Sequence, residues 1–349
     1  MRAPLLGLLI GLSFATGLWA DAPVQTLTSP PSTQSANQPM PEAMLAFIDN
    51  LAKQDGFDKN TLLALFKTVS KNDAIIEKIS KPSEKLPWYK YKKIFEGDAR
   101  LKEGVAFWQA NEATLLRAEQ TYQVPAEIIV AILGVETQYG KFTGTFPVLE
   151  SLTTLAFYYP PRAEFFKGEL RQYLLLMREE GVVPMEMKGS YAGAMGKPQF
   201  ISSSYRNFAV DFDQDGRRDL AGSTSDAIGS VANYFHAHDW KMGQPVVTRA
   251  KLNRHGARKI SMQNPADLQS AKLNYSLEAL VSHGVRPKMK VVPEEQQVSL
   301  MAFDAEDDLE YWIGFHNFSV ITKYNLSPHY AMAVYQLSEQ LKAQRRAKS

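Results

Sequence analysis

Apolar side chains return at helical spacing along most of the first half of the chain. Two short runs after Pro41 each place their large apolar residues on one face, in the order Met44, Phe47, Ile48, Leu51 and then Leu62, Leu65, Phe66, Val69. Two such runs close together predict a pair of packed helices. A longer amphipathic stretch without proline covers about residues 98–122. A new helix is expected at Pro125, because proline suits the first helical turn.

The pattern changes after Trp240. The segments 244–252, 296–303 and 310–315 are short, rich in β-branched or aromatic residues, and separated by turn residues. Such segments predict a small antiparallel sheet between about residues 241 and 318. Because helical patterns dominate elsewhere, the expected fold class is mainly α, of the α+β kind.

Three further helices are expected on either side of the sheet. The first covers residues 162–180, and the second covers residues 225–240 with Ser225 or Asp226 as its cap. The last begins after Ser327, which is also a capping residue, and has basic side chains near its C-terminal end, where they suit the helix dipole. The helices therefore occupy both ends of the sequence.

The N-terminus has the pattern of a secretory signal peptide, predicted at residues 1–20. Arg2 precedes an apolar run that ends at Trp19 and the small residue Ala20, and this run is too short for a comfortable membrane span. An uncleaved anchor or a buried N-terminal helix is the alternative. Residues 21–41 are rich in Pro, Ser, Thr and Gln, which predicts a flexible linker.

Composition narrows the classes of partner. The formal net charge is only +2, from 39 basic and 37 acidic residues, so no strong field attracts nucleic acid or an anionic membrane. The chain has no cysteine, which excludes disulfides, thiolate metal sites and lipid attachment through an N-terminal cysteine. Together with the predicted signal peptide, these features predict an exported, soluble protein that is not lipid-anchored. Its mature form should have no integral membrane segment and no nucleic-acid partner.

A single glutamate lies on the apolar face of the helix that begins near Pro125. In this helix Ile128, Ile132 and Glu136 lie on one face, and Gly140 lets the chain turn soon afterwards. Burial and the negative end of the helix dipole both disfavour the ionised form, so Glu136 should keep its proton to a higher pH than a free glutamate. A proton donor at a lysozyme-like site needs this property. The alternative is a solvated or ion-paired surface glutamate.

A loop rich in small residues, 189–205, forms a second candidate region. Small side chains let backbone approach a ligand closely. Ser190, Gln199 and Tyr205 add hydrogen-bonding groups and an aromatic ring, which suit a polar sugar chain. A tight structural loop between helices is the alternative.

The segment "DFDQDGRRDL" has aspartates at alternate positions followed by a glycine, as in the first half of an EF-hand calcium loop. These aspartates are Asp211, Asp213 and Asp215. The usual twelfth-position glutamate is replaced by Gly222, but Asp226 at the start of the next helix would close a longer loop. A structural calcium ion is the favoured interpretation and a solvated turn is the alternative. No cofactor is expected for the chemistry itself.

Four segments together resemble the lytic murein transglycosylase B family, a lysozyme-like family that acts on peptidoglycan. They begin "VPAEIIVAILGVETQYGKF", "GSYAGAMGKPQF", "DAIGSVANYF" and "HYAMAV", and the similarity runs from about residue 42 to the C-terminal helix. The resemblance implies three lobes. They are a lysozyme-like catalytic core (116–218), a helical lobe (42–115, completed by 219–240 and 319–349) and a small β lobe (241–318).

The resemblance also implies an activity and a set of site residues. It implies cleavage of the β-1,4 bond between N-acetylmuramic acid and N-acetylglucosamine with formation of 1,6-anhydro ends, and Glu136 as the sole catalytic acid. Glycan-binding roles are implied for Tyr91, Ser190, Gln199, Tyr234, Tyr324 and Asn325. The expected partners are peptidoglycan glycan strands and other cell-wall enzymes. Lys197 and Pro198 depart from the family pattern of an aromatic residue and a glycine, which raises the question of a changed subsite.

Two other functions stay open at this point. A hydrolytic muramidase would need a second carboxylate opposite Glu136, and the candidates are Glu150, Glu164 and Glu169, although Glu164 could instead pair with Arg162. A non-catalytic cell-wall binding module or scaffold would use the same cleft only to hold the glycan.

Overall fold

The computed structural model describes residues 40–80, 86–252, 262–263, 265, 271–289 and 296–347. The predicted signal peptide and nearly all of the predicted linker lie outside the described residues. Within the described ranges, no helix combines the length and the apolar character needed to cross a bilayer.

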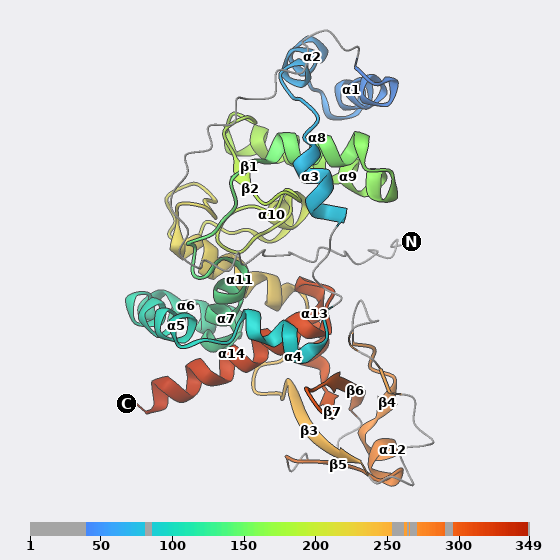
Figure 1. The fold of residues 1–349 in the computed structure, drawn as a ribbon. Helices are drawn as coiled ribbons and strands as arrows, with labels where there is room; N and C mark the ends of the chain where they lie inside the picture. The colour runs from blue at the N-terminus through green and yellow to red at the C-terminus, as the bar shows by residue number, and fades with distance from the viewer. Residues whose placement is uncertain are drawn as a thin grey trace, which may run out of the picture.

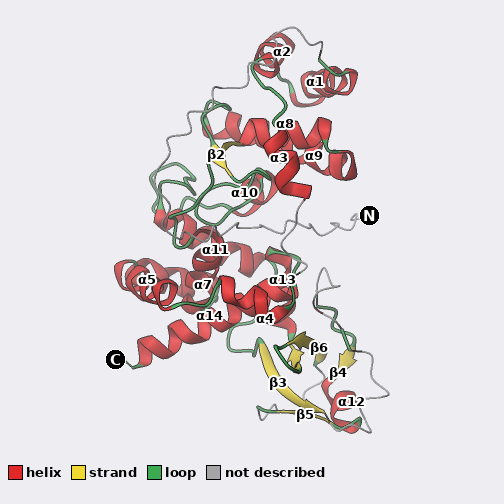
Figure 2. Cartoon of the chain, in the orientation of Figure 1, coloured by secondary structure: helices red, strands yellow, loops and turns green. Residues whose placement is uncertain are grey.

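The fold is mainly helical, as predicted (Figures 1 and 2). The α-helices are α1 Glu42–Asp55, α2 Lys59–Lys67, α3 Asp73–Ser80, α4 Trp88–Tyr91, α5 Asp98–Ala110, α6 Glu112–Tyr122, α7 Ala126–Thr137, α8 Val148–Tyr158, α9 Ala163–Glu180, α10 Ser202–Phe208, α11 Thr224–Ala237, α12 Leu277–Ser282, α13 His316–Tyr324 and α14 Pro328–Arg346. Two short 3-10 helices are η2 Lys92–Ile94 and η3 Pro160–Arg162. The first two helices pack on each other and form the predicted pair.

The sheet lies at one end of the molecule, and α1 and α2 lie at the other end (Figure 1). Its five strands are antiparallel in the order β4-β6-β7-β3-β5. The three predicted strands are present as β3 Val247–Leu252, β6 Gln297–Asp304 and β7 Leu309–Gly314. Two shorter strands were not predicted, β4 Tyr275–Ser276 and β5 Val285–Pro287. A separate ribbon pairs β1 Phe146–Pro147 with β2 Lys188–Gly189.

Helix α7 lies in the main hydrophobic core. Every residue of α7 except Glu127 is buried, and the helix packs against α5, α6, α11 and α14. A helix that is apolar on all sides is stable only inside a core. Burial of the whole helix therefore carries Glu136 into the interior.

The chain turns sharply directly after α7. Gln138, Tyr139 and Gly140 have φ values of 49°, 61° and 92°, so the left-handed turn begins two residues before the glycine that was expected to permit it. The Tyr139 ring folds back on Gly134, where a Cβ atom would lie 2.6 Å from the tyrosine hydroxyl oxygen. That hydroxyl donates a hydrogen bond to the carbonyl of Arg100 (3.1 Å). Gly134 is thus required for the turn that follows the helix.

Two helix boundaries differ from the sequence-based expectation. The stretch 98–122 is two helices, α5 and α6, because Asn111 leaves helical geometry (φ −120°, ψ 22°) and its side chain donates to the carbonyl of Phe107 (2.8 Å). The cap of α11 is Ser223, whose hydroxyl accepts from the amide of Asp226 (3.1 Å), rather than Ser225 or Asp226. The predicted cap Ser327 of α14 is confirmed.

Candidate active site

Glu136 lies near the end of α7, and only 1% of its surface is exposed. Its Oε1 accepts a hydrogen bond from the hydroxyl of Tyr330 on α14, at 2.6 Å. Its Oε2 has no hydrogen-bond partner among the described residues. Tyr330 therefore holds one carboxyl oxygen in place, while no described residue holds the other.

Burial controls the protonation of Glu136. Loss of hydration raises the pKa of this carboxyl to about 8, and the hydrogen bond from Tyr330 acts in the opposite direction. The pKa of Glu136 rises because the loss of hydration has a larger effect than the hydrogen bond. At neutral pH the side chain is a carboxylic acid, which is the form able to donate a proton. The elevated pKa expected from the sequence is confirmed.

Three tyrosines, Tyr234, Tyr324 and Tyr330, form an aromatic wall beside the carboxyl of Glu136. The rings of Tyr324 and Tyr330 are nearly parallel, with an interplanar angle of 6° and 6.4 Å between their centroids. Burial raises the pKa of both hydroxyls well above the ordinary value, and the nearby Glu136 raises them further. Tyr234 on α11 packs edge-on against Tyr324, with 4.8 Å between ring centroids. Of the glycan-binding candidates, Tyr234 and Tyr324 are thus brought together beside Glu136.

The hydroxyls of this wall fix neighbouring backbone. Tyr324 donates to the carbonyl of Pro198 (2.6 Å), and Tyr234 donates to the carbonyl of Lys323 (2.7 Å). Asn325, which follows α13, is 8% exposed. These contacts join the small-residue loop, α11 and α13 around one site.

The small-residue loop is held by its own polar side chains. Ser190 accepts from the amides of Ala192 (3.3 Å) and Ala194 (3.0 Å) through its hydroxyl oxygen. Gln199 has a positive φ of 52° and donates from Nε2 to the carbonyls of Thr143 (3.0 Å) and Gly196 (2.9 Å). Both side chains are largely buried, so they shape the loop as well as offering groups to a ligand.

Tyr205, which the sequence suggested as a glycan contact, is occupied in the structure. Its hydroxyl donates to the carbonyl of Arg218 and accepts from the amide of Leu220 (3.2 Å), and the residue is 4% exposed. It therefore anchors residues 218–220, the end of the "DFDQDGRRDL" segment.

Tyr91 reaches the same region from α4. Its ring packs against Phe95 and His329, with centroid distances of 5.4 Å to each, and it is 7% exposed. Tyr91 also influences the ionisation of Tyr330, the partner of Glu136. The sequence indicated no role in the site for Tyr330, although it lies in the quoted "HYAMAV" segment.

The three alternative carboxylates each have a protein partner. Glu150 accepts from the side-chain amide of Asn72 (2.5 Å), and Glu169 accepts from the backbone amide of Ser203 (2.9 Å). Glu164 pairs with Lys167 (2.7 Å). Each of the three carboxylates is therefore engaged by a residue near it in the described part of the fold.

Lys197 points towards the aspartate-rich loop. Its ammonium donates to the carbonyls of Ala221 (2.6 Å) and Gly222 (2.9 Å), and its aliphatic stem passes over Gly140. Its own carbonyl accepts from the hydroxyl of Thr137 (2.7 Å). Lys197, which departs from the family pattern, thus links the end of α7 to the loop before α11.

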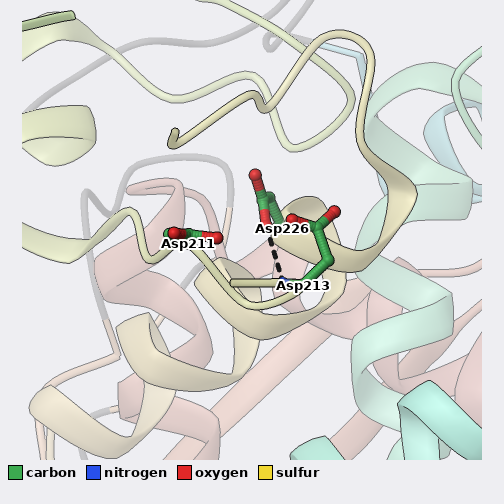
Figure 3. Close-up of side chains that lie close together, drawn as sticks. All are labelled: Asp211, Asp213 and Asp226. Atoms are coloured by element: carbon green, nitrogen blue, oxygen red, sulfur yellow. Dashed lines mark hydrogen bonds between the residues drawn. The ribbon is translucent and has the colours of Figure 1, made fainter. Parts of the chain in front are cut away.

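Three aspartates from two elements meet at the candidate metal site (Figure 3). Ligand oxygens of Asp211, Asp213 and Asp226 all lie within 4.8 Å of one another. Asp226 is fully buried and accepts from the amides of Phe212 (2.7 Å) and Asp213 (3.3 Å). Asp215 is outside this group, and its carboxylate accepts from a backbone amide two residues later (2.9 Å). The arrangement fits a hard cation, because three hard oxygen donors converge and unneutralised carboxylates would repel one another.

Comparisons with known proteins agree with this arrangement. Residues 40–339 match the family described as the transglycosylase SLT domain. The chain is 41% identical over 303 residues to the membrane-bound lytic murein transglycosylase B of Escherichia coli, covering 84% of this chain and 81% of that protein.

Three solved structures are similar over most of their length. Soluble lytic transglycosylase SltB1 of Pseudomonas aeruginosa is 44% identical with a TM-score of 0.80, over 87% of this chain and 99% of that one. Escherichia coli Slt35, solved in complex with calcium, is 40% identical with a TM-score of 0.79, over 87% and 94%. Pseudomonas aeruginosa SltB3, solved with NAG-NAM-pentapeptide, is 32% identical with a TM-score of 0.74, over 86% and 79%.

The match with the family covers α7, the small-residue loop and the sheet alike, and it confirms the predicted lysozyme-like fold class. Its relatives are lytic transglycosylases, and one of them binds a peptidoglycan fragment. The chain belongs to the transglycosylase SLT family and is a peptidoglycan lytic transglycosylase.

Proposed function

We propose that Glu136 is the only acid and base of the reaction and that the products carry 1,6-anhydro-N-acetylmuramic acid ends. The observation that carries this proposal is the buried carboxyl with a pKa raised to about 8, whose Oε2 has no hydrogen-bond partner in the part of the chain that the structure describes. A carboxylic acid at neutral pH can protonate the glycosidic oxygen between N-acetylmuramic acid and N-acetylglucosamine. Oε2 is the atom that we assign to this transfer, since Oε1 is held by Tyr330.

The proton balance closes without water. As the glycosidic bond breaks, the proton of Glu136 passes to the departing oxygen. The resulting carboxylate then takes the proton of the muramic C6 hydroxyl while that oxygen bonds to C1, so Glu136 returns to its starting form. The hydrogen bond from Tyr330 stabilises the intermediate carboxylate. The substrate's acetamido group is the candidate for stabilising positive charge at C1, as in substrate-assisted glycosidases.

The glycan strand is assigned to the region around the aromatic wall. We assign Tyr91, Tyr234, Tyr324 and Asn325 to one side of the bound sugar chain and the loop with Ser190 and Gln199 to the other. Support comes from their positions: Tyr324 stacks parallel to Tyr330, and its hydroxyl donates to the carbonyl of Pro198, the residue before Gln199. We also propose that the chain is divided into the three lobes that the family resemblance implies.

The remaining proposals concern location and partners. The chain is assigned to the periplasm as an exported, unanchored protein, on the basis of the apolar run that ends at Trp19 and the lack of a cysteine for lipid attachment. Other cell-wall enzymes are proposed as partners on the resemblance alone.

Product analysis tests the reaction. The protein without residues 1–20 should convert purified peptidoglycan to muropeptides with anhydro ends, identified by mass spectrometry as lacking one water. Products with reducing ends would instead show a hydrolase, and intact peptidoglycan would favour a non-catalytic binding protein. A sample treated with a hydrolytic muramidase supplies the reducing-end control.

Calcium is proposed as a structural ion held by Asp211, Asp213 and Asp226, with Asp215 as a further predicted ligand. The ion would offset the charge of three carboxylates and fix the loop between α10 and α11. It takes no part in the proton transfers. The chemistry of the donor set supports this proposal, as does the calcium in the Slt35 structure.

Thermal unfolding tests the calcium site. A hundredfold excess of calcium over its Kd should stabilise the protein by about 2.7 kcal/mol, which corresponds to a rise in Tm of roughly 4–8 °C. Asp213→Asn should abolish most of this rise, because it removes one ligand of the group. Asp73→Asn, which changes an exposed aspartate on α3, serves as the matched control and should leave the rise intact. An equal rise in all three proteins would refute the site.

A further inference from the structure

Phe142 presents an aromatic ring to solvent just after the catalytic helix. It is 58% exposed, although phenylalanine is usually buried. A single exposed apolar residue on a surface needs no special explanation. Its setting is the reason to consider it further.

The turn that carries Phe142 is fixed at many points. The amide of Phe142 donates to the carbonyl of Thr137 (3.0 Å), and Gln138 donates to Glu103 (2.6 Å). Gln138 and Tyr139 hold positive φ values that non-glycine residues seldom adopt. Backbone of this kind persists only where the surrounding structure enforces it, often near functional sites. The exposed ring therefore sits on a fixed turn.

The residues after Phe142 touch the loop assigned to glycan binding. The carbonyl of Thr143 accepts from Nε2 of Gln199 (3.0 Å). Gly144 lies so close to the backbone of Ser190 that a Cβ atom would fall 2.1 Å from the carbonyl oxygen of Gly189. Phe142 is thus one residue from the first contact and two from the second.

The charged residue that directly precedes Phe142 in the chain, Lys141, is already paired. The ammonium of Lys141 lies 2.5 Å from Oε1 of Glu103. A peptide stem with carboxylates would need an unpaired cation at this point, whereas the flat face of a sugar ring needs an apolar surface. The surroundings therefore favour a sugar ring over a peptide stem.

We propose that Phe142 is a substrate contact that stacks on a sugar ring of the glycan strand outside the bond being cleaved, and that it sets a preference for longer strands. The proposal rests on the assignment of the glycan to the loop that contains Ser190 and Gln199. Phe142 contributes to binding and takes no part in proton transfer.

Cleavage of peptide-free glycan strands of defined length tests the proposal. Phe142→Ala should raise KM for long strands roughly 5- to 30-fold and leave kcat unchanged. The shortest strand that is cleaved should show no change in KM. Phe142→Tyr should behave as the wild type, and Phe142→Leu should resemble Phe142→Ala because it lacks a ring. Leu45→Ala on the distant helix α1 is the matched control for loss of an exposed apolar side chain (Figure 1).

Several outcomes would overturn the proposal. They are an unchanged KM at every length, a fall in kcat alone, wild-type behaviour of Phe142→Leu, and an effect seen only with peptide-bearing strands. Direct binding of the same strands to Glu136→Gln, with and without Phe142→Ala, does not depend on cleavage. Failure of the proposed chemistry would appear separately, as missing anhydro products from the wild-type protein.

Discussion

Glu136→Gln is expected to lower the rate of peptidoglycan cleavage by roughly 10²–10⁴-fold while the protein stays folded. Glutamine has almost the same volume and keeps an oxygen that can accept the hydrogen bond now made by Tyr330 at 2.6 Å. An amide cannot protonate the glycosidic oxygen, and it cannot accept the C6 proton afterwards. The measurement is the initial rate of anhydro-muropeptide release from purified peptidoglycan.

Glu169→Gln is the matched control for this experiment. Glu169 is also buried, at 6% exposure, but it lies on α9 and accepts from the amide of Ser203 (2.9 Å), a contact that glutamine can keep. Cleavage by this variant should stay within a few-fold of the wild type. Comparable losses in both variants would mean that a buried glutamate matters only for the fold, and full activity of Glu136→Gln would remove Glu136 from the mechanism.

The protonation of Glu136 could be predicted from sequence because it depends on local features. The apolar run of α7 places Ile128, Ile132 and Glu136 on one face, so any tertiary structure that buries the helix also buries the carboxyl. The three main strands were predictable for a similar reason, since β-branched and aromatic residues concentrate in each. Strands β4 and β5 contain only two and three residues, too few to form a pattern.

The partner of Glu136 could not be predicted in this way. Tyr330 is 194 positions away, and its hydroxyl meets the carboxyl only because α14 packs against α7. Sequence periodicity gives the face of a helix but not its neighbour in space. The break at Asn111 escaped prediction because its cause is one side chain that bonds to backbone.

The candidate metal site could be predicted from the sequence only in part. Alternating carboxylates identified Asp211 and Asp213 directly, and the missing twelfth-position ligand directed attention to Asp226 on the next helix. These three meet in the structure, while Asp215 accepts a local backbone hydrogen bond outside the group. A motif thus predicted the location, and tertiary structure determined which oxygens are close.

Glu136 is also expected to make the wild-type protein less stable as the pH rises from about 5 to about 8. The pKa of its carboxyl is about 8 in the folded protein, against 4.5 as the ordinary value. Between these values the folded state keeps a proton that the unfolded state releases. The free energy of unfolding should therefore fall with pH, by up to about 1.4 kcal/mol per pH unit, and level off above pH 8. Below pH 4.5 the contribution is fully present.

Glu136→Gln isolates this effect, because its side chain does not titrate. The variant should match the wild type near pH 5 and exceed it by several kcal/mol at pH 8, measured as the free energy of unfolding in denaturant. Burial lowers the pKa of His329 to about 4, so this residue adds a slope of opposite sign below pH 6.5, but it does so in both proteins and cancels in the difference. A difference that stays constant with pH would show that the carboxyl is already ionised at neutral pH. Where burial keeps a catalytic glutamate protonated, its replacement by glutamine should thus remove activity and raise stability at pH 8. Replacement of an ordinary surface glutamate should change neither activity nor stability.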